Sequence, residues 1–284
     1  MAITFQKVGY EYPQLQQQKY AIAEIDLFIE PTKEFVAVIG HTGSGKSTLV
    51  QHMNALLTPT TGLLNVFGHE VAKGKPLSPI RKRVGMVFQF PEYQLFEETV
   101  ERDIMFGPTN FGASKEEAKV KAADVLGMVG LDASLLTRSP FSLSGGQMRR
   151  VAIAGILAME PDILILDEPT VGLDPAGQEE MMKLFLALHE TYHKTLIIVT
   201  HDMNVVAEYA KRVLVMKEGR LAFDGTPQDL FSDQTRLETY QLGRPDISHV
   251  MHALGTALNL TIPDHLITMD DAVDFLKEQL PCKS

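Results

Sequence analysis

The sequence lacks the features of a disulfide-bonded protein, a membrane-spanning protein and a nucleic-acid-binding protein. Its only cysteine is Cys282, near the end of the chain, so neither an internal disulfide nor a cysteine cluster for zinc can form. No apolar run approaches the ~20 residues of a membrane-spanning helix. Asp and Glu number 36 against 26 Lys and Arg, and the net charge of −10 argues against nucleic acid as the main partner.

The composition is that of an ordinary globular protein, with 45% hydrophobic and 22% charged residues. A chain of 284 residues can bury a large core, and this length suggests one large domain or one domain with an extension. The single cysteine fits a reducing cytosol, and the first seven residues lack the form of a signal peptide. We therefore expect any role at a membrane to depend on a partner.

Residues 40–47 read GHTGSGKS, between the strand-like run Phe35–Ile39 and a helix-like run over residues 47–57. A strand, a glycine-rich loop and a helix in this order are typical of the phosphate-binding loop G-x-x-x-x-G-K-[ST]. The glycines let backbone N–H groups and the positive end of the helix dipole point at a phosphate. We expect Lys46 to contact the β- and γ-phosphates and Ser47 to offer a hydroxyl to Mg²⁺. The alternative is a chance glycine-rich turn. The predicted nucleotide-binding residues of this loop are Gly40, His41, Thr42, Gly43, Ser44, Gly45, Lys46, Ser47 and Thr48.

Two acidic residues, Asp167 and Glu168, end a short, uniformly apolar run over residues 163–166. Such a run is typical of a strand buried on both faces of a parallel sheet. A carboxylate at the end of a central strand, beside a phosphate-binding loop, is placed to hold Mg²⁺, and this is the role predicted for Asp167. Glu168 projects differently, and we predict that it is the general base for an attacking water. The alternative is a pair of surface acids.

A second helix start precedes these acids and reads LSGGQ. It consists of Leu143, Ser144, Gly145, Gly146 and Gln147. Ser144 can cap the helix that follows, and the glycines leave backbone N–H groups open to an anion. Because one nucleotide does not need two such helix ends from one side, we expect this one to close on the γ-phosphate of a partner chain. The alternative is an ordinary capped helix start.

The rest of the chain predicts an α/β protein followed by a small helical tail. Period-two alternation over residues 3–29 indicates antiparallel strands around a loop that holds residues 10–13 and a glutamine-rich stretch. Apolar runs at 163–166 and 196–199, joined by a helix over 176–192, indicate a βαβ unit. A helix is predicted over 115–129, and only helices after about residue 231. His249 and His252 have a spacing that suits metal ligands, but without a third ligand a solvated face is expected.

These motifs, in this order, resemble those of the ATP-binding cassette (ABC) ATPases. The sequence places Gln89 after a strand, then LSGGQ, Asp167 and Glu168, Asp174 in a Gly-Leu-Asp triplet, and His201 after another strand. The resemblance covers about residues 1–230. It implies a P-loop cassette with a mixed central sheet, an antiparallel N-terminal β subdomain, a helical signature subdomain at about 90–160 and a helical extension over 231–284.

The resemblance also implies roles for individual residues, with ATP and Mg²⁺ as ligands. Gln89 would sense Mg²⁺ and the attacking water, so that Ser47, Gln89 and Asp167 form the metal site. His201 would bind the γ-phosphate and join Lys46, Gln89 and Glu168 as catalytic residues. Asp174 would lie at the seam of an ATPase dimer. Tyr12 would stack on adenine, although Tyr10 is a nearby competitor and an aromatic residue in a loop can simply fill the core.

A finer resemblance follows Gln89, where residues 90–100 read FPEYQLFEETV. This run is similar to that of the ATPases of energy-coupling factor transporters, most of all the second of two paralogous ATPases. It implies a vitamin or transition-metal importer on the cytoplasmic face of the membrane. The implied partners are a second ATPase (a paralogue, or a copy of this chain), a membrane coupling subunit and a substrate-binding membrane subunit. Coupling helices would dock at Pro91, Glu92, Tyr93 and Leu95; the alternative is a half-buried helix with a wet acidic face.

Other kinds of ABC protein leave different traces in a sequence. One alternative is that the chain is the ATPase of another class of ABC importer. A soluble ATPase acting on DNA or ribosomes predicts zinc cysteines, coiled-coil arms or two cassettes in one chain, none of which the sequence has. A regulatory binder without turnover predicts the loss of Glu168, His201 or Ser144, and all three are present. The resemblance further implies that the helical tail helps to hold two ATPases together.

Overall fold

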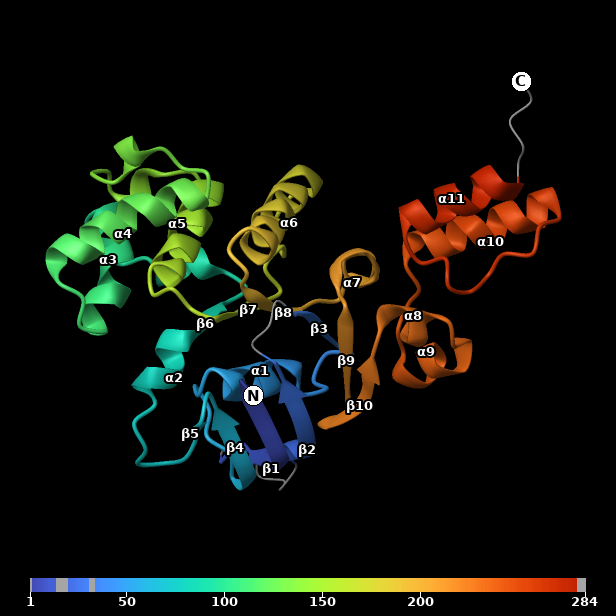
Figure 1. Ribbon diagram of the computed structural model, residues 1–284, viewed down its shortest axis with the longest axis horizontal. Coiled ribbons are helices and arrows are strands. Elements are labelled where there is room, and N and C mark those ends of the chain that lie inside the picture. Colours follow the sequence, from blue (N-terminus) through green and yellow to red (C-terminus); the bar gives the residue numbers. More distant parts are fainter. Residues whose placement is uncertain (1, 14–19, 31–33, 280–284) are drawn as a thin grey trace.

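A computed structural model describes residues 2–13, 20–30 and 34–279. Near the start of the chain it has an antiparallel sheet of four strands in the order β2-β1-β4-β5 (Figure 1). This agrees with the predicted antiparallel subdomain, but Tyr10 and Glu11 extend the first strand instead of lying in the expected loop. The glutamine-rich stretch lies outside the described residues. The strands are β1 (Ile3–Glu11), β2 (Tyr20–Ile29), β4 (Thr61–Val66) and β5 (His69–Glu70).

A mixed sheet of six strands forms the centre of the molecule, in the order β10-β9-β3-β8-β7-β6. Five strands are parallel, and only β10 runs antiparallel to its neighbour. In β3, Phe35, Ala37 and Ile39 face one hydrophobic cluster while Val36 and Val38 face the other, which explains its uniformly apolar sequence. The strands are β3 (Phe35–Ile39), β6 (Val84–Val87), β7 (Ile163–Asp167), β8 (Thr195–Val199), β9 (Arg212–Lys217) and β10 (Arg220–Gly225).

The parallel register brings four strand ends to one edge of this sheet. Val38 pairs with Val199, Asp167 also pairs with Val199, and Val87 pairs with Leu166. The segments that follow β3, β6, β7 and β8 therefore leave the sheet side by side. In open α/β sheets this carboxyl edge is where ligands bind.

Helices cover both faces of the central sheet. Helix α1 (Lys46–Met53) contributes Leu49, Val50 and Met53 to the cluster shared with the antiparallel sheet. Helix α6 (Pro175–Glu190) joins β7 to β8, as the βαβ pattern predicts, and packs on the opposite face. Two shorter helices lie beside them, α2 (Ser78–Arg83) and α7 (Met203–Tyr209).

A helical subdomain projects from one side of the sheet (Figure 1). Its helix α4 agrees with the predicted helix over 115–129, and Ser114 caps it through a capping box with Glu117. Helix α3, capped by Thr99, was not predicted from the sequence. Residues 91–94, for which a half-buried helix was one alternative, form a short 3₁₀ turn. The elements are η1 (Pro91–Gln94), α3 (Val100–Asn110), α4 (Lys115–Met128), η2 (Ala133–Leu135), η3 (Pro140–Ser142) and α5 (Gly145–Leu157).

The tail is helical, as predicted, and begins with two helices that pack on the main core. Leu230, Phe231 and Leu237 belong to the large cluster, whereas α10 and α11 share a small cluster built on Met251, Leu266 and Ala272. His249 and His252 are exposed. Within the described ranges, no helix has the length and apolarity needed to cross a membrane. The tail helices are α8 (Pro227–Phe231), α9 (Gln234–Tyr240), α10 (Asp246–Leu258) and α11 (Met269–Gln279).

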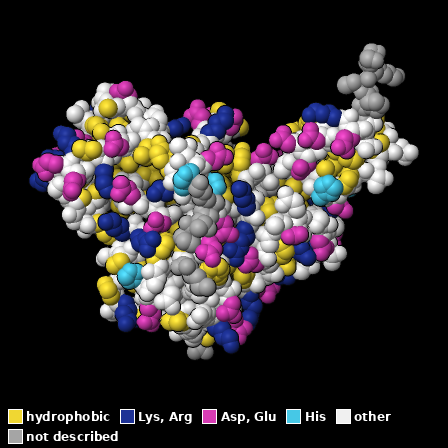
Figure 2. Space-filling view, viewed as in Figure 1, with side chains coloured by type: hydrophobic (Ala, Val, Ile, Leu, Met, Phe, Trp, Pro, Cys, Tyr) yellow, Lys and Arg dark blue, Asp and Glu magenta, His cyan; other side chains and the backbone are white. Residues whose placement is uncertain are grey.

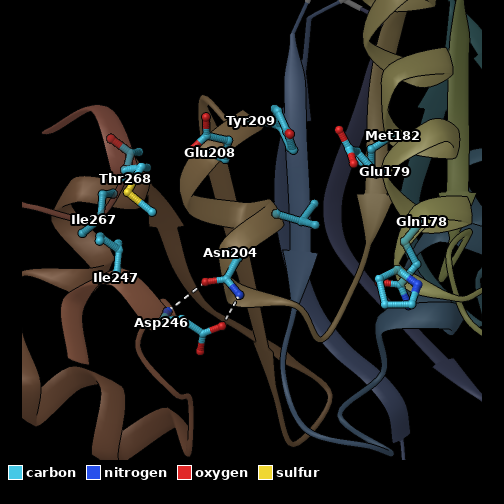
Figure 3. Close-up of a pocket in the computed structure, with 13 residues that line it drawn as sticks. Gln178, Glu179, Met182, Asn204, Glu208, Tyr209, Asp246, Ile247, Ile267 and Thr268 are labelled. Carbon is cyan, nitrogen blue, oxygen red and sulfur yellow. Dashed lines mark hydrogen bonds between the residues drawn. The ribbon is translucent and has the colours of Figure 1, made fainter. Parts of the chain in front are cut away.

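A cleft of about 440 Å³ separates the α10–α11 pair from α6 and α7. Figure 2 shows the surface hollowed between these two parts of the molecule. Asn204 of α7 and Asp246 of α10 connect them across the cleft through two hydrogen bonds (Figure 3). The Asn204 amide donates to the Asp246 carboxylate at 2.9 Å, and the Asp246 backbone N–H donates to Asn204 Oδ1 at 2.8 Å.

Candidate nucleotide-binding site

The glycine-rich loop after β3 is pressed against two neighbouring strands. Gly40 and Gly45 have φ values of 141° and 102°, in the region that favours glycine. A Cβ atom on Gly40 would lie 2.2 Å from the Met216 carbonyl oxygen, and one on Gly45 would lie 2.7 Å from that of Ala21. The loop conformation therefore requires glycine at both positions.

Lys46 begins α1, and its side chain folds back over this loop. It is only 6% exposed, and its Nζ donates to the carbonyl oxygens of Gly40 at 2.8 Å and His41 at 3.1 Å. Burial lowers the pKa of Lys46, an effect that the nearby carboxylates of Glu168 and Asp167 partly oppose. The ammonium group is thus held beside a cavity, where a bound phosphate would add a negative charge close to it.

A cavity of about 390 Å³ opens beside the loop. Tyr12 lines it, and the Tyr12 hydroxyl lies 3.1 Å from Thr48 Oγ1. Tyr10, by contrast, packs behind Tyr12 and against His52, with both pairs of ring centroids 4.9 Å apart. Of the two tyrosines, only Tyr12 lines the cavity. The loop residues that line it are His41, Gly43, Gly45, Lys46, Ser47 and Thr48, so Gly40, Thr42 and Ser44 do not.

Three predicted catalytic residues meet at the carboxyl edge of the sheet. Glu168 accepts a hydrogen bond from the Gln89 amide at 3.2 Å, and its other carboxylate oxygen lies 2.9 Å from His201 Nε2. Glu168 has a φ of 49° and its backbone N–H donates to Val199, which turns its side chain away from the line of the strand. Glu168 and His201 both line a second cavity, of about 300 Å³. The sequence predicted these residues but not their mutual contacts.

The predicted metal ligands suit magnesium. The Ser47 side chain is near enough to Asp167 to lower the pKa of its carboxyl group, so two of the three predicted ligands lie together. Burial, and then the charge of Glu168, raise the pKa of Asp167. Carboxylate, hydroxyl and amide oxygens are the ligands that Mg²⁺ takes, and a dication would relieve the repulsion between the two adjacent carboxylates.

The LSGGQ residues lie at the start of α5, in the helical subdomain. Ser144 caps the helix by accepting from the Gln147 N–H at 3.3 Å, and the Gln147 side chain accepts from the Ser144 N–H at 3.1 Å. Leu143 is buried, whereas a Cβ added to Gly145 or Gly146 would meet no atom within 4 Å. In the described part of the chain, no residue of this motif lines either cavity of the site.

Comparisons with known proteins identify the family and the fold of this chain. The family model described as "ABC transporter" matches residues 22–171. The energy-coupling factor transporter ATP-binding protein EcfA2 of Lactiplantibacillus plantarum is 50% identical, with 99% of this chain and 96% of that protein covered. EcfA2 of Enterococcus faecalis is 49% identical, with 99% and 98% covered.

The chain belongs to the ABC transporter family.

Among solved structures, cbiO1 of Clostridium perfringens, described as part of the ABC transporter complex cbiONQ, has a TM-score of 0.73. It is 36% identical, and the match covers 88% of this chain and 98% of that one. The dimeric ABC cassette MJ0796 with bound ADP and Pi has a TM-score of 0.69 at 31% identity, covering 79% and 98%. The predicted ABC cassette fold is therefore confirmed, as is the resemblance to the energy-coupling factor ATPases.

The segment after Gln89 in this ABC ATPase is more buried than its sequence suggests. Pro91 and Leu95 are buried, and the Glu92 carboxylate points inward to Arg149 at 3.1 Å. Tyr93 is 84% exposed. Of the four residues predicted to dock coupling helices, Tyr93 is therefore the most exposed to solvent.

Two further positions bear on the ABC site. Asp174 is exposed and caps α6 by accepting from the Gly177 N–H at 2.9 Å. Arg149, which the sequence analysis did not single out, is 3% exposed and contacts several site segments. An arginine two residues after LSGGQ, shortly before a run of apolar residues in the same helix, was the signal that could have revealed it.

Proposed function

We propose that this ABC ATPase is the ATP-hydrolysing subunit of an energy-coupling factor importer for a vitamin or a transition-metal ion. Hydrolysis of ATP is the activity of the family, and the EcfA2 relatives carry the transporter in their names. The observation that carries the catalytic part is the meeting of Gln89, Glu168 and His201 beside the phosphate-binding loop.

In this proposal, each residue of the site has a separate task. Lys46 and the loop N–H groups bind the phosphates, and Tyr12 stacks on the adenine. Glu168 accepts the proton of the attacking water, while Gln89 and His201 hold one carboxylate oxygen each until the substrate displaces them. His201 then faces the γ-phosphate. Magnesium, held by Ser47, Asp167 and Gln89, would neutralise charge on the β- and γ-phosphates.

We further propose that each ATP lies between two ATPases. The support is the position of LSGGQ, whose open glycines and helix-capping serine lie outside both described cavities of the site in their own chain. Ser144 would close on the γ-phosphate bound by the second ATPase, with Asp174 at the seam. The resemblance favours a paralogue as this second ATPase, and a copy of this chain is the other possibility. The tail helices would help to hold the two together.

The membrane side of the proposal concerns the segment from Pro91 to Leu95. A groove of about 320 Å³ lies beside it, lined in part by Leu95, Phe96 and Phe106. Phe96 and Phe106 are 56% and 46% exposed. Exposed aromatic residues beside a groove are typical of a protein interface. We propose that a membrane coupling subunit docks here, on the cytoplasmic face, and that a separate membrane subunit binds the substrate.

The variant Glu168→Gln tests this function most simply. It keeps the size and the hydrogen-bonding capacity of the side chain but cannot accept the proton. We expect ATP binding to persist while kcat falls by about 10²- to 10⁴-fold and substrate uptake by the reconstituted complex stops. The exposed Glu190→Gln is the matched control. Phosphate release at the wild-type rate from Glu168→Gln would reject the assignment of the base.

A further inference from the structure

The guanidinium of Arg149 is a buried charge with several hydrogen-bond partners from distant parts of the chain. It lies in α5, two residues after the LSGGQ motif, and is 3% exposed. It donates to both carboxylate oxygens of Glu92, at 3.1 and 3.3 Å. It also donates to the carbonyl oxygens of Gln89 at 3.4 Å, Pro169 at 3.3 Å and Val171 at 3.2 Å.

These acceptors belong to the segments that carry the catalytic side chains. Arg149 bonds to the backbone of Gln89 itself and, through Pro169 and Val171, to the segment that directly follows Glu168. The side chains of Gln89 and Glu168 meet at 3.2 Å. One guanidinium therefore fixes both backbones from which this catalytic contact is made.

The chemistry of arginine suits this position. Guanidinium has five N–H donors in a rigid plane, so it can hold a carboxylate and several carbonyl groups at once, which a lysine ammonium cannot do with the same geometry. A buried charge is costly unless it is paired and fully hydrogen-bonded. Residues Val151 to Ala154 of the same helix are buried and apolar. Hydrophobic packing therefore does not explain a charged side chain at position 149.

We propose that Arg149 is a positioning residue that holds Gln89 and Glu168 in their catalytic arrangement and ties both of them to Glu92. The proposal rests on the proposed function, in which the segment from Pro91 to Leu95 meets the membrane coupling subunit. A shift of Glu92 caused by that subunit would move Arg149, and with it the contact between Gln89 and Glu168. The LSGGQ helix, which carries Arg149, would move with them.

The test compares Arg149→Met with Arg150→Met in the complete transporter complex. Arg150 is the next residue of α5, but its guanidinium bonds to Val129 at 2.9 Å and Glu180 at 2.9 Å, away from the site. For Arg149→Met we expect kcat for ATP to fall about 10- to 100-fold, the effect of misplacing catalytic groups by about 1 Å. KM for ATP stays unchanged because the Lys46 loop is not among the contacts of Arg149. The control keeps the wild-type kcat.

A double-mutant cycle with Glu92→Gln separates positioning from general damage to the fold. If Arg149 acts through its bond to Glu92, Glu92→Gln lowers kcat in the wild-type background and has no further effect in Arg149→Met. An Arg149→Met complex with wild-type kcat, a rise in KM with unchanged kcat, or additive effects of the two substitutions would each overturn the proposal.

If the Arg149→Met variant does not assemble into the transporter complex, Arg149→Lys tests the positioning role instead. It keeps the charge but loses the planar fork, so we expect a kcat below that of the wild type with KM unchanged. A wild-type kcat for Arg149→Lys in that case overturns the proposal. ATP hydrolysis and substrate uptake by the wild-type complex test the proposed function. The positioning role is tested separately, because it is judged only by the ratio of the variant kcat to the wild-type kcat.

Discussion

Asp167 carries its charge in an environment that disfavours it. Burial raises the pKa of Asp167, the charge of Glu168 raises it further, and Ser47 and Lys46 only partly compensate. The folded protein therefore binds this proton more tightly than the unfolded chain, whose ordinary pKa is 3.8. It follows that the ionised Asp167 costs stability as the pH rises above 3.8 through the folded pKa, and that the whole cost is present above the folded pKa.

Asp167→Asn removes this cost together with a predicted magnesium ligand. At pH 7 and without nucleotide, we expect the variant to have a larger free energy of unfolding in urea than the wild type. The difference should shrink as the pH is lowered toward the ordinary pKa of 3.8. The same variant should lose magnesium-dependent ATP hydrolysis. A variant that is less stable than the wild type at pH 7 contradicts this view of Asp167.

The residues of the site differ in how far the sequence could predict them. The phosphate-binding loop, Asp167 and His201 follow strands whose apolar runs are visible, and parallel strand ends must share one edge. Arg149 and Glu92 are 57 positions apart and meet only because the helical subdomain packs as it does. The placement of Tyr10 behind Tyr12 likewise depends on packing against His52.

At the scale of elements, long periodic segments were predictable and short helices were not. Helix α4 has a capping box and a buried alanine face, and α6 connects two buried strands. Helix α3 contains Gly107 and Pro108, which normally argue against a helix, yet its Ile104 packs into the main core. Tertiary contacts outweigh local preference there, and a single sequence does not reveal them.

The short turn η1 presents one large side chain to solvent, Tyr93. We expect Tyr93→Ala to weaken association with the membrane coupling subunit by about 10- to 30-fold, the loss typical of a central interface tyrosine. ATP binding by the isolated chain should be unchanged. This substitution leaves the bond between Glu92 and Arg149 in place, which a change at Glu92 does not. Tyr192→Ala, at a tyrosine that is 42% exposed after α6, is the matched control.

Co-purification from detergent-solubilised membranes measures this association. Equal yields of the coupling subunit with Tyr93→Ala and with the control would count against docking at η1.

Helix α10 takes its N-terminal cap from another part of the molecule. Pro245 precedes it and provides no side-chain cap, and the Asp246 N–H donates instead to Asn204 of α7. A helix cap is worth about 1 kcal/mol. We expect Asn204→Ala to raise the rate of amide hydrogen exchange in α10 about fivefold, with little change in the central sheet. Asn110→Ala, at an exposed position at the end of α3, is the control. An unchanged rate of amide hydrogen exchange in α10 would show that the hydrogen bond from Asp246 to Asn204 does not stabilise this helix.

At the scale of the whole molecule, the two halves of the proposed ATP site lie in different places. The phosphate-binding loop is at the carboxyl edge of the central sheet, whereas LSGGQ starts a helix of the projecting subdomain (Figure 1). Neither half contains all the groups that the proposed reaction needs. In the proposed pair, a second ATPase supplies the missing half, and this would explain why Ser144 and Asp174 serve only as helix caps among the described residues of their own chain.

The specific rate of ATP hydrolysis as a function of protein concentration tests this shared site most directly. The full-length chain, purified with the ATPase with which it pairs, is diluted while light scattering follows its mass. We predict that hydrolysis per chain falls as the pair dissociates and recovers on concentration. A constant rate per chain in samples that contain only monomer would contradict an ATP site shared between two ATPases.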